Sequence, residues 1–187
     1  MLRAKKLVLL SHCLLNVNAK VGGLANYSGA QEELISYLVQ KGFGIIQLPC
    51  PEMGCGGARR WGQTRQQLDT PFFRDYCQKI FRPIMHQVID YISNGYELVA
   101  LIGINSSPSC GVNITCSAAS WGGELHNWSS IESITQELEL IPYPGVFMEQ
   151  IIISLEVKDI KIPLLAVDEA DPASSLSEIK LFLEGEV

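Results

Sequence analysis

The sequence has little positive charge, no long apolar run and no low-complexity tract. Its 14 Lys and Arg face 20 Asp and Glu, so the net charge is −6 at pH 7, and no basic stripe is present to follow a nucleic-acid backbone. No segment approaches the roughly 20 apolar residues that a membrane span requires. The N-terminal apolar run is short and leads directly into His12, unlike a secretory signal. We therefore expect a cytoplasmic protein that acts on a small molecule, with no nucleic-acid and no membrane partner.

The six cysteines form no Cys-x-x-Cys pair. A zinc ribbon or finger needs such local pairs, or Cys and His at short spacing, and a ferredoxin needs a compact run of cysteines. Thiols stay reduced in the cytoplasm, so cysteines there are more often metal ligands, catalytic groups or core residues than disulfide partners. The spacing therefore leaves a site that is assembled from distant parts of the chain.

The remaining composition is typical of a globular protein. The chain has 187 residues, of which 47% are hydrophobic and 18% charged. A domain of this size buries roughly 70% of the surface of its unfolded chain, so its stability does not require disulfides. We expect residues 1–187 to form a single domain.

Apolar runs alternate with helical patterns along the chain. The runs at 8–10 and 99–102 lack polar alternation, which is typical of strands buried on both faces of a parallel sheet. We expect strands at 8–10, 44–48, 97–104 and 162–167, and helices at 32–39, 71–93, 145–157 and 175–184. This alternation predicts an α/β fold with a doubly wound, Rossmann-like, mainly parallel sheet and helices on both of its faces.

Helix starts and one long loop are also readable from the sequence. Ser28 with Gln31, and Ser175 with Glu178, have the spacing of capping boxes, while Thr70 before a proline predicts the start of the long helix. The Ser-, Gly- and Asn-rich residues 105–128 predict a long polar loop over the carboxyl edge of the sheet.

Three cysteines each follow an apolar run that predicts a strand: Cys13, Cys50 and Cys110. The carboxyl ends of parallel strands meet at one edge of the sheet, where open α/β folds bind ligands. Thiolates are soft donors that hold zinc or iron–sulfur clusters, and three of them leave a fourth metal position open. The alternative is that these cysteines are small buried core residues.

Three motifs carry a family resemblance. They are residues 11–16 (Ser-His-Cys-Leu-Leu-Asn), 49–52 (Pro-Cys-Pro-Glu) with a Gly-Gly pair at 56–57, and 107–111 (Ser-Pro-Ser-Cys-Gly). In this order they resemble the motifs of the thiouracil desulfidase (TudS) family, and the resemblance extends to about residue 111. Asn16 and residues 58–62 (Ala-Arg-Arg-Trp-Gly) depart from the usual pattern and are more similar to a divergent branch of that family.

The resemblance implies an enzyme and a cofactor. Cys13, Cys50 and Cys110 would each ligate one iron of a 4Fe-4S cluster, and the fourth iron would bind the sulfur of a thiolated substrate. Glu52 would act as the acid/base, and Ser107 would orient or protonate the substrate. The implied reaction is a non-redox desulfidase reaction in sulfur metabolism, in which a thiouracil-like thiocarbonyl becomes a carbonyl and sulfide is released. The implied partner is a small thiolated heterocycle, and a homodimer is compatible with the sequence.

Two other functions fit the residues. A cysteine-dependent hydrolase or transferase would use Cys13 or Cys110 as nucleophile, with His12 or His126 as base. A non-enzymatic regulatory domain would hold zinc or a cluster without turnover.

Individual residues also have ordinary structural interpretations. Glu52 could pair with Arg59 or cap a helix, and the serines of the third motif could bond only to local backbone. Either Cys55 or Cys116 could be a fourth ligand, a sulfur relay or an unligated loop thiol, whereas Cys77 is expected to pack inside a helix layer. A further group either reads a heterocycle by stacking and charge or belongs to a solvated loop: Arg59, Arg60, Trp61 and Arg65.

Overall fold

The computed structural model describes residues 3–118, 121–122, 130 and 137–185. His126 and part of the polar stretch at 105–128 lie outside these residues. In the described part of the chain, no helix is both long enough and apolar enough to cross a bilayer.

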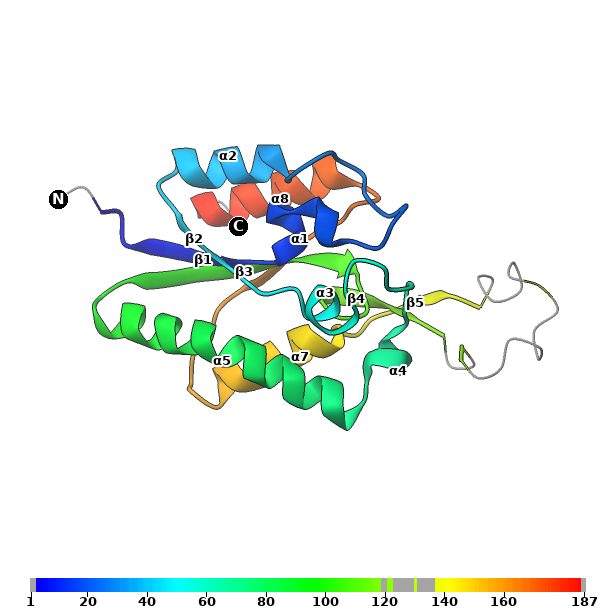
Figure 1. Cartoon of the computed structure of the whole chain (residues 1–187). Coiled ribbons are helices and arrows are strands. Elements are labelled where there is room, and N and C mark those ends of the chain that lie inside the picture. The colour runs from blue at the N-terminus through cyan, green and yellow to red at the C-terminus, as the bar shows by residue number, and fades with distance from the viewer. Residues whose placement is uncertain (1–2, 119–120, 123–129, 131–136, 186–187) are drawn as a thin grey trace.

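A mainly parallel sheet forms the centre of the molecule (Figure 1). Its strands are β1 (Lys6–Leu10), β2 (Gly44–Gln47), β3 (Glu97–Ser106), β4 (Gly111–Ser117), β5 (Glu139–Ile141) and β6 (Leu164–Val167). The order is β2-β1-β3-β4-β5, and β6 also pairs with β3. Only the β4–β5 pair is antiparallel among the described pairs. The register places Val8 opposite Ile45 of β2 and Leu10 opposite Ile102 of β3.

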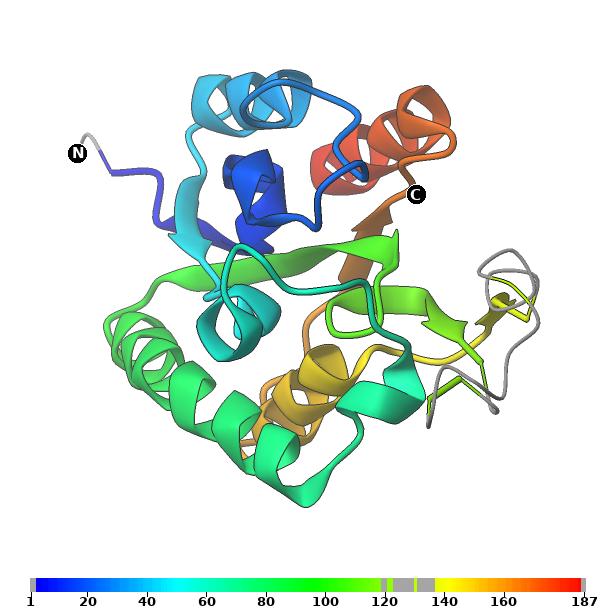
Figure 2. The ribbon, with the colours of Figure 1, turned by 45° about the vertical axis from the view of Figure 1, so that its right-hand side comes forward.

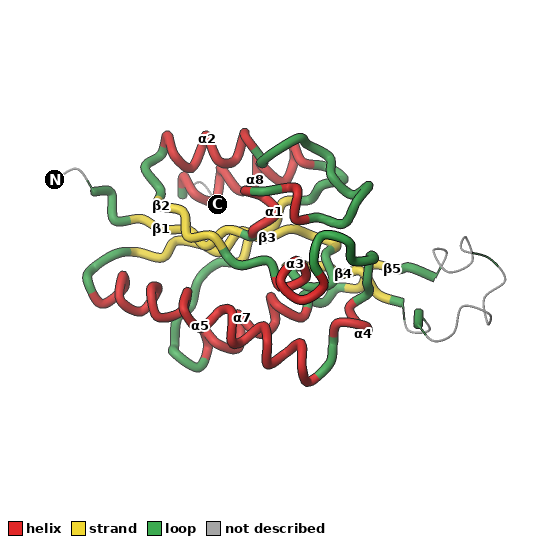
Figure 3. The backbone as a smooth tube through the Cα atoms, viewed as in Figure 1, coloured by secondary structure: helices red, strands yellow, loops and turns green. Residues whose placement is uncertain are grey.

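Helices cover both faces of this sheet (Figures 2 and 3). On one side lie α1 (His12–Leu15), α2 (Glu32–Gln40) and α8 (Pro172–Glu184). On the other lie α5 (Pro71–Ser93) and α7 (Val146–Glu156), with the short α3 (Pro51–Gly56) and α4 (Arg65–Leu68) nearby. A 3₁₀ turn, η1 (Val17–Ala19), follows α1. The predicted Rossmann-like α/β fold is confirmed.

The core explains why the strands read as continuous apolar runs. Val8, Leu9 and Leu10 are fully buried because helices pack on both faces of β1. On the α5–α7 side, the rings of Phe81 and Phe147 meet edge to face with centroids 6.4 Å apart. Cys77 is fully buried in α5, as expected for a residue that packs within a helix layer.

Two predicted capping boxes are wrong, and one predicted cap is confirmed. The N-cap of α2 is Gln31, without a side-chain cap bond. The helix α8 begins at Pro172, because the Asp171 side chain accepts a hydrogen bond from Ser174 N. Asp before Pro is itself a strong start signal. The Thr70 hydroxyl accepts from the N–H of Phe73 at 3.2 Å, as predicted for the start of α5.

The predicted long loop is partly a strand. β3 continues to Ser106, and β4 occupies 111–117. The polar residues of β4 misled the prediction because their side chains are satisfied inside the fold: Thr115 is fully buried and donates to Ser107 O at 2.9 Å. A polar strand can be buried where each polar group finds a partner.

Candidate functional site

The structure brings the three predicted thiols to one edge of the sheet. Cys13 lies in α1 directly after β1, Cys50 directly precedes α3 after β2, and Cys110 lies in the turn between β3 and β4. Burial is the main cause of the raised pKa of Cys13 and Cys110, and smaller contributions come from the charge of Cys50 on Cys13 and from the charges of Cys13 and Cys50 on Cys110. The thiols are therefore close enough to interact electrostatically. They lie where β1 has β2 on one side and β3 on the other, the strand-order reversal at which α/β folds bind ligands.

Burial controls the protonation of these thiols. It raises the pKa of Cys13 to about 12, the pKa of Cys110 well above its ordinary value, and the pKa of Cys50 in the same direction. A thiol is a poor nucleophile unless it ionises, so this environment disfavours a cysteine hydrolase that works without metal. A bound metal group would displace the protons and stabilise the thiolates.

The local sequence presents Cys50 at a helix start. Cys50 is the N-cap of α3, and its Sγ accepts a hydrogen bond from Met53 N at 3.3 Å. Pro51 occupies the first helical position, where its missing N–H costs nothing. The thiol thus takes the place that Ser or Asp usually fills, and its sulfur is oriented by the backbone.

The turn that carries Cys110 is shaped by Ser107. The Ser107 Oγ accepts hydrogen bonds from Cys110 N at 3.0 Å and from Ser109 N at 3.4 Å. A Cβ on Gly111 would lie 2.4 Å from Ile114 O and 2.6 Å from Ser107 O, so the turn requires glycine. Since the two N–H groups use only acceptor positions of the hydroxyl, the O–H of Ser107 can donate either to Ser109 Oγ, 3.4 Å away, or to a substrate that displaces this long contact. That role remains a prediction.

Glu52 lies between two side chains that hold its carboxylate. Ser109 Oγ donates to Oε1 at 2.5 Å, and Arg60 Nε lies 3.3 Å from Oε2. The Glu52 side chain is only 11% exposed and that of Arg60 only 6%. Arg59 is exposed, so the predicted pairing of Glu52 with Arg59 is wrong, and its partner is the neighbouring Arg60.

Arg60 also ties three segments together. Its guanidinium donates to Ala19 O at 2.6 Å and to Gly57 O at 3.1 Å. These carbonyls follow α1 and α3, the helices that present Cys13 and lie beside Cys50. From the sequence, Arg60 was expected either to read a heterocycle or to belong to a solvated loop. The buried guanidinium shows that the second interpretation is wrong. The adjacent Trp61, in contrast, is 88% exposed.

A second charged pair lies beside Cys13 and was not anticipated from the sequence. Lys20 forms an ion pair with Glu169, and its ammonium lies 5.3 Å from the ring centre of Tyr27. The Tyr27 hydroxyl donates to Cys13 O at 3.0 Å. Burial is the main cause of the raised pKa of Cys13; the positive charge of Lys20 lowers this pKa, and the negative charge of Glu169 raises it.

The other candidate residues have contacts of their own within the fold. His12 Nδ1 lies 2.6 Å from Gln47 Nε2, and burial lowers its pKa. Cys55 is exposed, and its charge adds to burial, the main cause, in raising the pKa of Tyr76 and Cys77 in α5. Cys116 is half-buried on β4, where it pairs with Leu140 of β5. These positions support structural or unligated roles for both cysteines.

The N-terminus of α7 holds the turn that carries Cys110. The first N–H groups of a helix lack partners within the helix, and here the turn supplies them. The pairs are Gly145 N with Gly111 O (2.9 Å), Val146 N with Pro108 O (3.0 Å), and Phe147 N and Met148 N with Ser109 O (2.9 and 3.0 Å). The position of Cys110 is therefore set by α7 as well as by β3.

Gly145→Ala should disrupt this contact. A Cβ at Gly145 would lie 2.5 Å from Ser109 C and 2.9 Å from Cys110 N, and backbone atoms cannot move aside cheaply. We expect a loss of about 1–3 kcal/mol in the free energy of unfolding, measured by urea denaturation. Gly62→Ala is the matched control, because a Cβ there meets nothing within 4 Å. Equal stability of the two variants would contradict the close approach.

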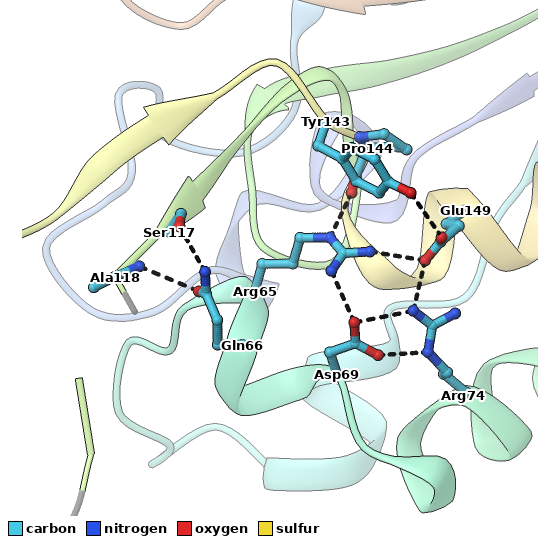
Figure 4. Close-up of polar contacts among 9 residues, drawn as sticks. All are labelled: Arg65, Gln66, Asp69, Arg74, Ser117, Ala118, Tyr143, Pro144 and Glu149. Atoms are coloured by element: carbon cyan, nitrogen blue, oxygen red, sulfur yellow. Dashed lines mark hydrogen bonds and ion pairs between the residues drawn. The ribbon is translucent and has the colours of Figure 1, made fainter. Parts of the chain in front are cut away.

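A network of charges fixes the segment before α7 (Figure 4). Arg65 of α4 donates to Pro144 O at 3.0 Å and pairs with Asp69 and Glu149, each at 2.8 Å. Arg74 of α5 pairs with Glu149 at 2.9 Å and also with Asp69. The hydrogen bond from Arg74, followed by the charges of both arginines, lowers the pKa of Asp69. The network joins α4, α5 and α7.

The same figure shows how α4 contacts β4. Gln66 donates to Ser117 Oγ at 2.6 Å and accepts from Ala118 N at 3.2 Å. The Arg65 guanidinium lies over the ring of Tyr143, 4.6 Å from its centre. Arg65 is thus engaged within the fold, and neither the heterocycle-reading interpretation nor the solvated loop describes it.

Arg65→Met should destabilise the protein. The substitution leaves Pro144 O without its charged donor and Glu149 with Arg74 as its remaining cation, and the Arg65 side chain is only 12% exposed. We expect the free energy of unfolding to fall by about 1–3 kcal/mol, measured by urea denaturation. Lys180→Met is the control, because its partner Glu33 is 62% exposed and such a surface pair contributes less than about 1 kcal/mol. A smaller loss for Arg65→Met than for the control would refute the role of the network.

Comparison with known proteins identifies a relative. No family model matches the chain, and no solved structure matches it. The uncharacterized protein MJ0003 of Methanocaldococcus jannaschii is 37% identical to this chain over 111 residues, which make up 59% of this chain and 70% of the archaeal protein. This chain therefore belongs to the same protein family as MJ0003.

Proposed function

We propose that this protein is an iron–sulfur-dependent desulfidase. Its substrate would be a small thiolated heterocycle, whose thiocarbonyl becomes a carbonyl as sulfide is released without net redox change. The observation that carries the proposal is the meeting of Cys13, Cys50 and Cys110 at one edge of the sheet, within electrostatic reach of one another. The resemblance of the three motifs to the thiouracil desulfidase family supports the same function.

The proposed cofactor is a cluster and not a single metal ion. In the part of the chain that the structure describes, no three His, Cys, Asp or Glu side chains form a group that could hold one metal ion. A 4Fe-4S cluster places its thiolates on different irons, so its ligands lie farther apart than ligands of one ion. Cys13, Cys50 and Cys110 would hold the cluster.

The side chains around the thiols supply the remaining chemistry. When bound, a cluster with three protein ligands offers an open iron that binds a soft sulfur and polarises the C=S bond. Glu52 would take a proton from water as the water oxygen bonds to the thiocarbonyl carbon, and would return it to the sulfur as the C–S bond breaks. The O–H of Ser107 would donate a hydrogen bond to the substrate. As the carbonyl forms, the second proton of the water would leave the added hydroxyl for the Glu52 carboxylate and then pass to the departing sulfide. One water is consumed and one H₂S is released, so atoms and electrons balance.

Sulfide release by the anaerobically reconstituted protein tests the proposal. The protein is incubated with 2-thiouracil, 4-thiouracil and 2-thiocytosine, and sulfide is measured together with the oxygenated product by mass spectrometry. We expect equal amounts of sulfide and product from at least one compound, and none from cluster-free protein. Fully reconstituted protein that releases no sulfide from any of the three would contradict the proposed reaction.

A further inference from the structure

We infer that Ser109 is a positioning residue for Glu52, an inference that rests on the proposed function. Ser109 is 1% exposed. Its Oγ lies 2.5 Å from Glu52 Oε1, 3.5 Å from Cys110 Sγ and 3.4 Å from Ser107 Oγ. This hydroxyl therefore links the predicted acid/base to a predicted cluster ligand and to the predicted substrate-orienting serine.

The chemistry of a hydroxyl decides the direction of these bonds. Ser109 has a single O–H hydrogen, and a carboxylate accepts it more strongly than a thiol sulfur or a second hydroxyl does. Ser109 thus donates to Glu52 Oε1, while Cys110 Sγ at 3.5 Å is a second and weaker acceptor for the same O–H, and a lone pair of Ser109 Oγ is left to accept from Ser107. The short separation from Oε1 agrees with a charge-assisted bond.

Ser109 is itself held firmly, which allows it to position another group. Its carbonyl accepts hydrogen bonds from Phe147 N and Met148 N at the start of α7. Its N–H donates to Ser107 Oγ. The backbone of Ser109 is therefore fixed by α7 and by the turn.

Glu52, in contrast, belongs to a short helix with few contacts to hold its side chain in place. Its helix α3 has six residues, and the four after Glu52 are exposed. Arg60 contacts only Oε2, at 3.3 Å. Without the hydroxyl of Ser109, the carboxylate is free to turn about its contact with Arg60, and Oε1 loses its fixed place beside the thiols.

Three substitutions test the inference. Ser109→Ala removes the hydroxyl, Ser109→Thr retains it, and Ser154→Ala removes a half-buried hydroxyl of α7 that donates to Gln150 O of its own helix. For Ser109→Ala we expect unchanged iron content and a kcat lower by about 10–100-fold, since a displacement of about 1 Å costs up to about 100-fold in rate. KM should change less than about threefold, because substrate binding is not the step affected. Ser109→Thr should recover most of kcat, and Ser154→Ala should leave it unchanged.

Crystal structures of the anaerobic variants give a second measurement that does not depend on activity. In Ser109→Ala the Glu52 carboxylate should leave its present place, and in Ser109→Thr it should stay. If Ser109→Ala does not fold, Ser109→Cys replaces it with the same expectations, because its S–H is a weak donor of similar size.

The outcomes separate this inference from the proposed function. Wild-type kcat in the folded Ser109→Ala variant, or an unmoved Glu52 in its crystal structure, would overturn the positioning role. If the wild-type protein releases no sulfide, the proposed function fails, and the place of Glu52 in the two variant structures still decides the inference.

Discussion

Alanine in place of Cys13, Cys50 or Cys110 should abolish cluster binding. Each thiol follows a different strand, and the three meet at one edge of the sheet. When only two of the thiols remain, one iron of the cluster loses its protein ligand. We expect iron to fall from about four per chain to less than about one, and the broad absorption near ~400 nm to disappear. Anaerobic iron and sulfide analysis measures the loss.

Two other cysteines serve as controls for this result. Cys77 is fully buried in α5, and Cys55 is exposed on α3. Alanine at either position should leave the iron content and the colour unchanged, although loss of the buried Cys77 thiol should lower stability by about 1 kcal/mol. Full iron content in any one of the Cys13, Cys50 or Cys110 variants would remove that cysteine from the ligand set.

Glu52→Gln should retain the cluster and lose sulfide release by about 100- to 10,000-fold, the range that positioned acid–base groups contribute. The amide has nearly the same shape as the carboxylate and can still accept from Ser109. It cannot take a proton from water. Arg60 should remain in place, because its bonds to Ala19 O and Gly57 O do not involve Glu52.

The matched control for this substitution is Glu33→Gln. Glu33 lies on α2 and pairs with Lys180 at the surface. It has no part in the proposed mechanism. Its variant should release sulfide at the wild-type rate. Turnover by Glu52→Gln equal to that of Glu33→Gln would take Glu52 out of the mechanism.

The central strands and the meeting of the thiols were predictable because both follow from local signals. An uninterrupted apolar run such as 8–10 fits a strand covered on both faces, and the carboxyl ends of parallel strands necessarily lie together. Cys13, Cys50 and Cys110 could therefore be placed at one edge before their side chains were seen. The start of α5 at Pro71 was also predictable from a local signal, because Thr70 is the N-cap of the helix that follows it.

The contacts around the thiols were not predictable, because they join residues distant in sequence. Lys20 and Glu169 are 149 positions apart, and Ser109 and Glu52 are 57 apart. No periodic pattern in the sequence indicates which distant residues form such pairs. The polar strand β4 was missed for a related reason: the partner of Thr115 is a backbone carbonyl, which the sequence pattern does not reveal.

The central claim is that three thiols share one iron–sulfur cluster. A crystal structure of the anaerobically reconstituted protein, with an anomalous difference map recorded at the iron absorption edge, tests it most directly. The account predicts one compact iron peak bonded to the Sγ atoms of Cys13, Cys50 and Cys110. Reconstituted protein whose iron lies at other residues, or whose three Sγ atoms point into separate parts of the core, would contradict it.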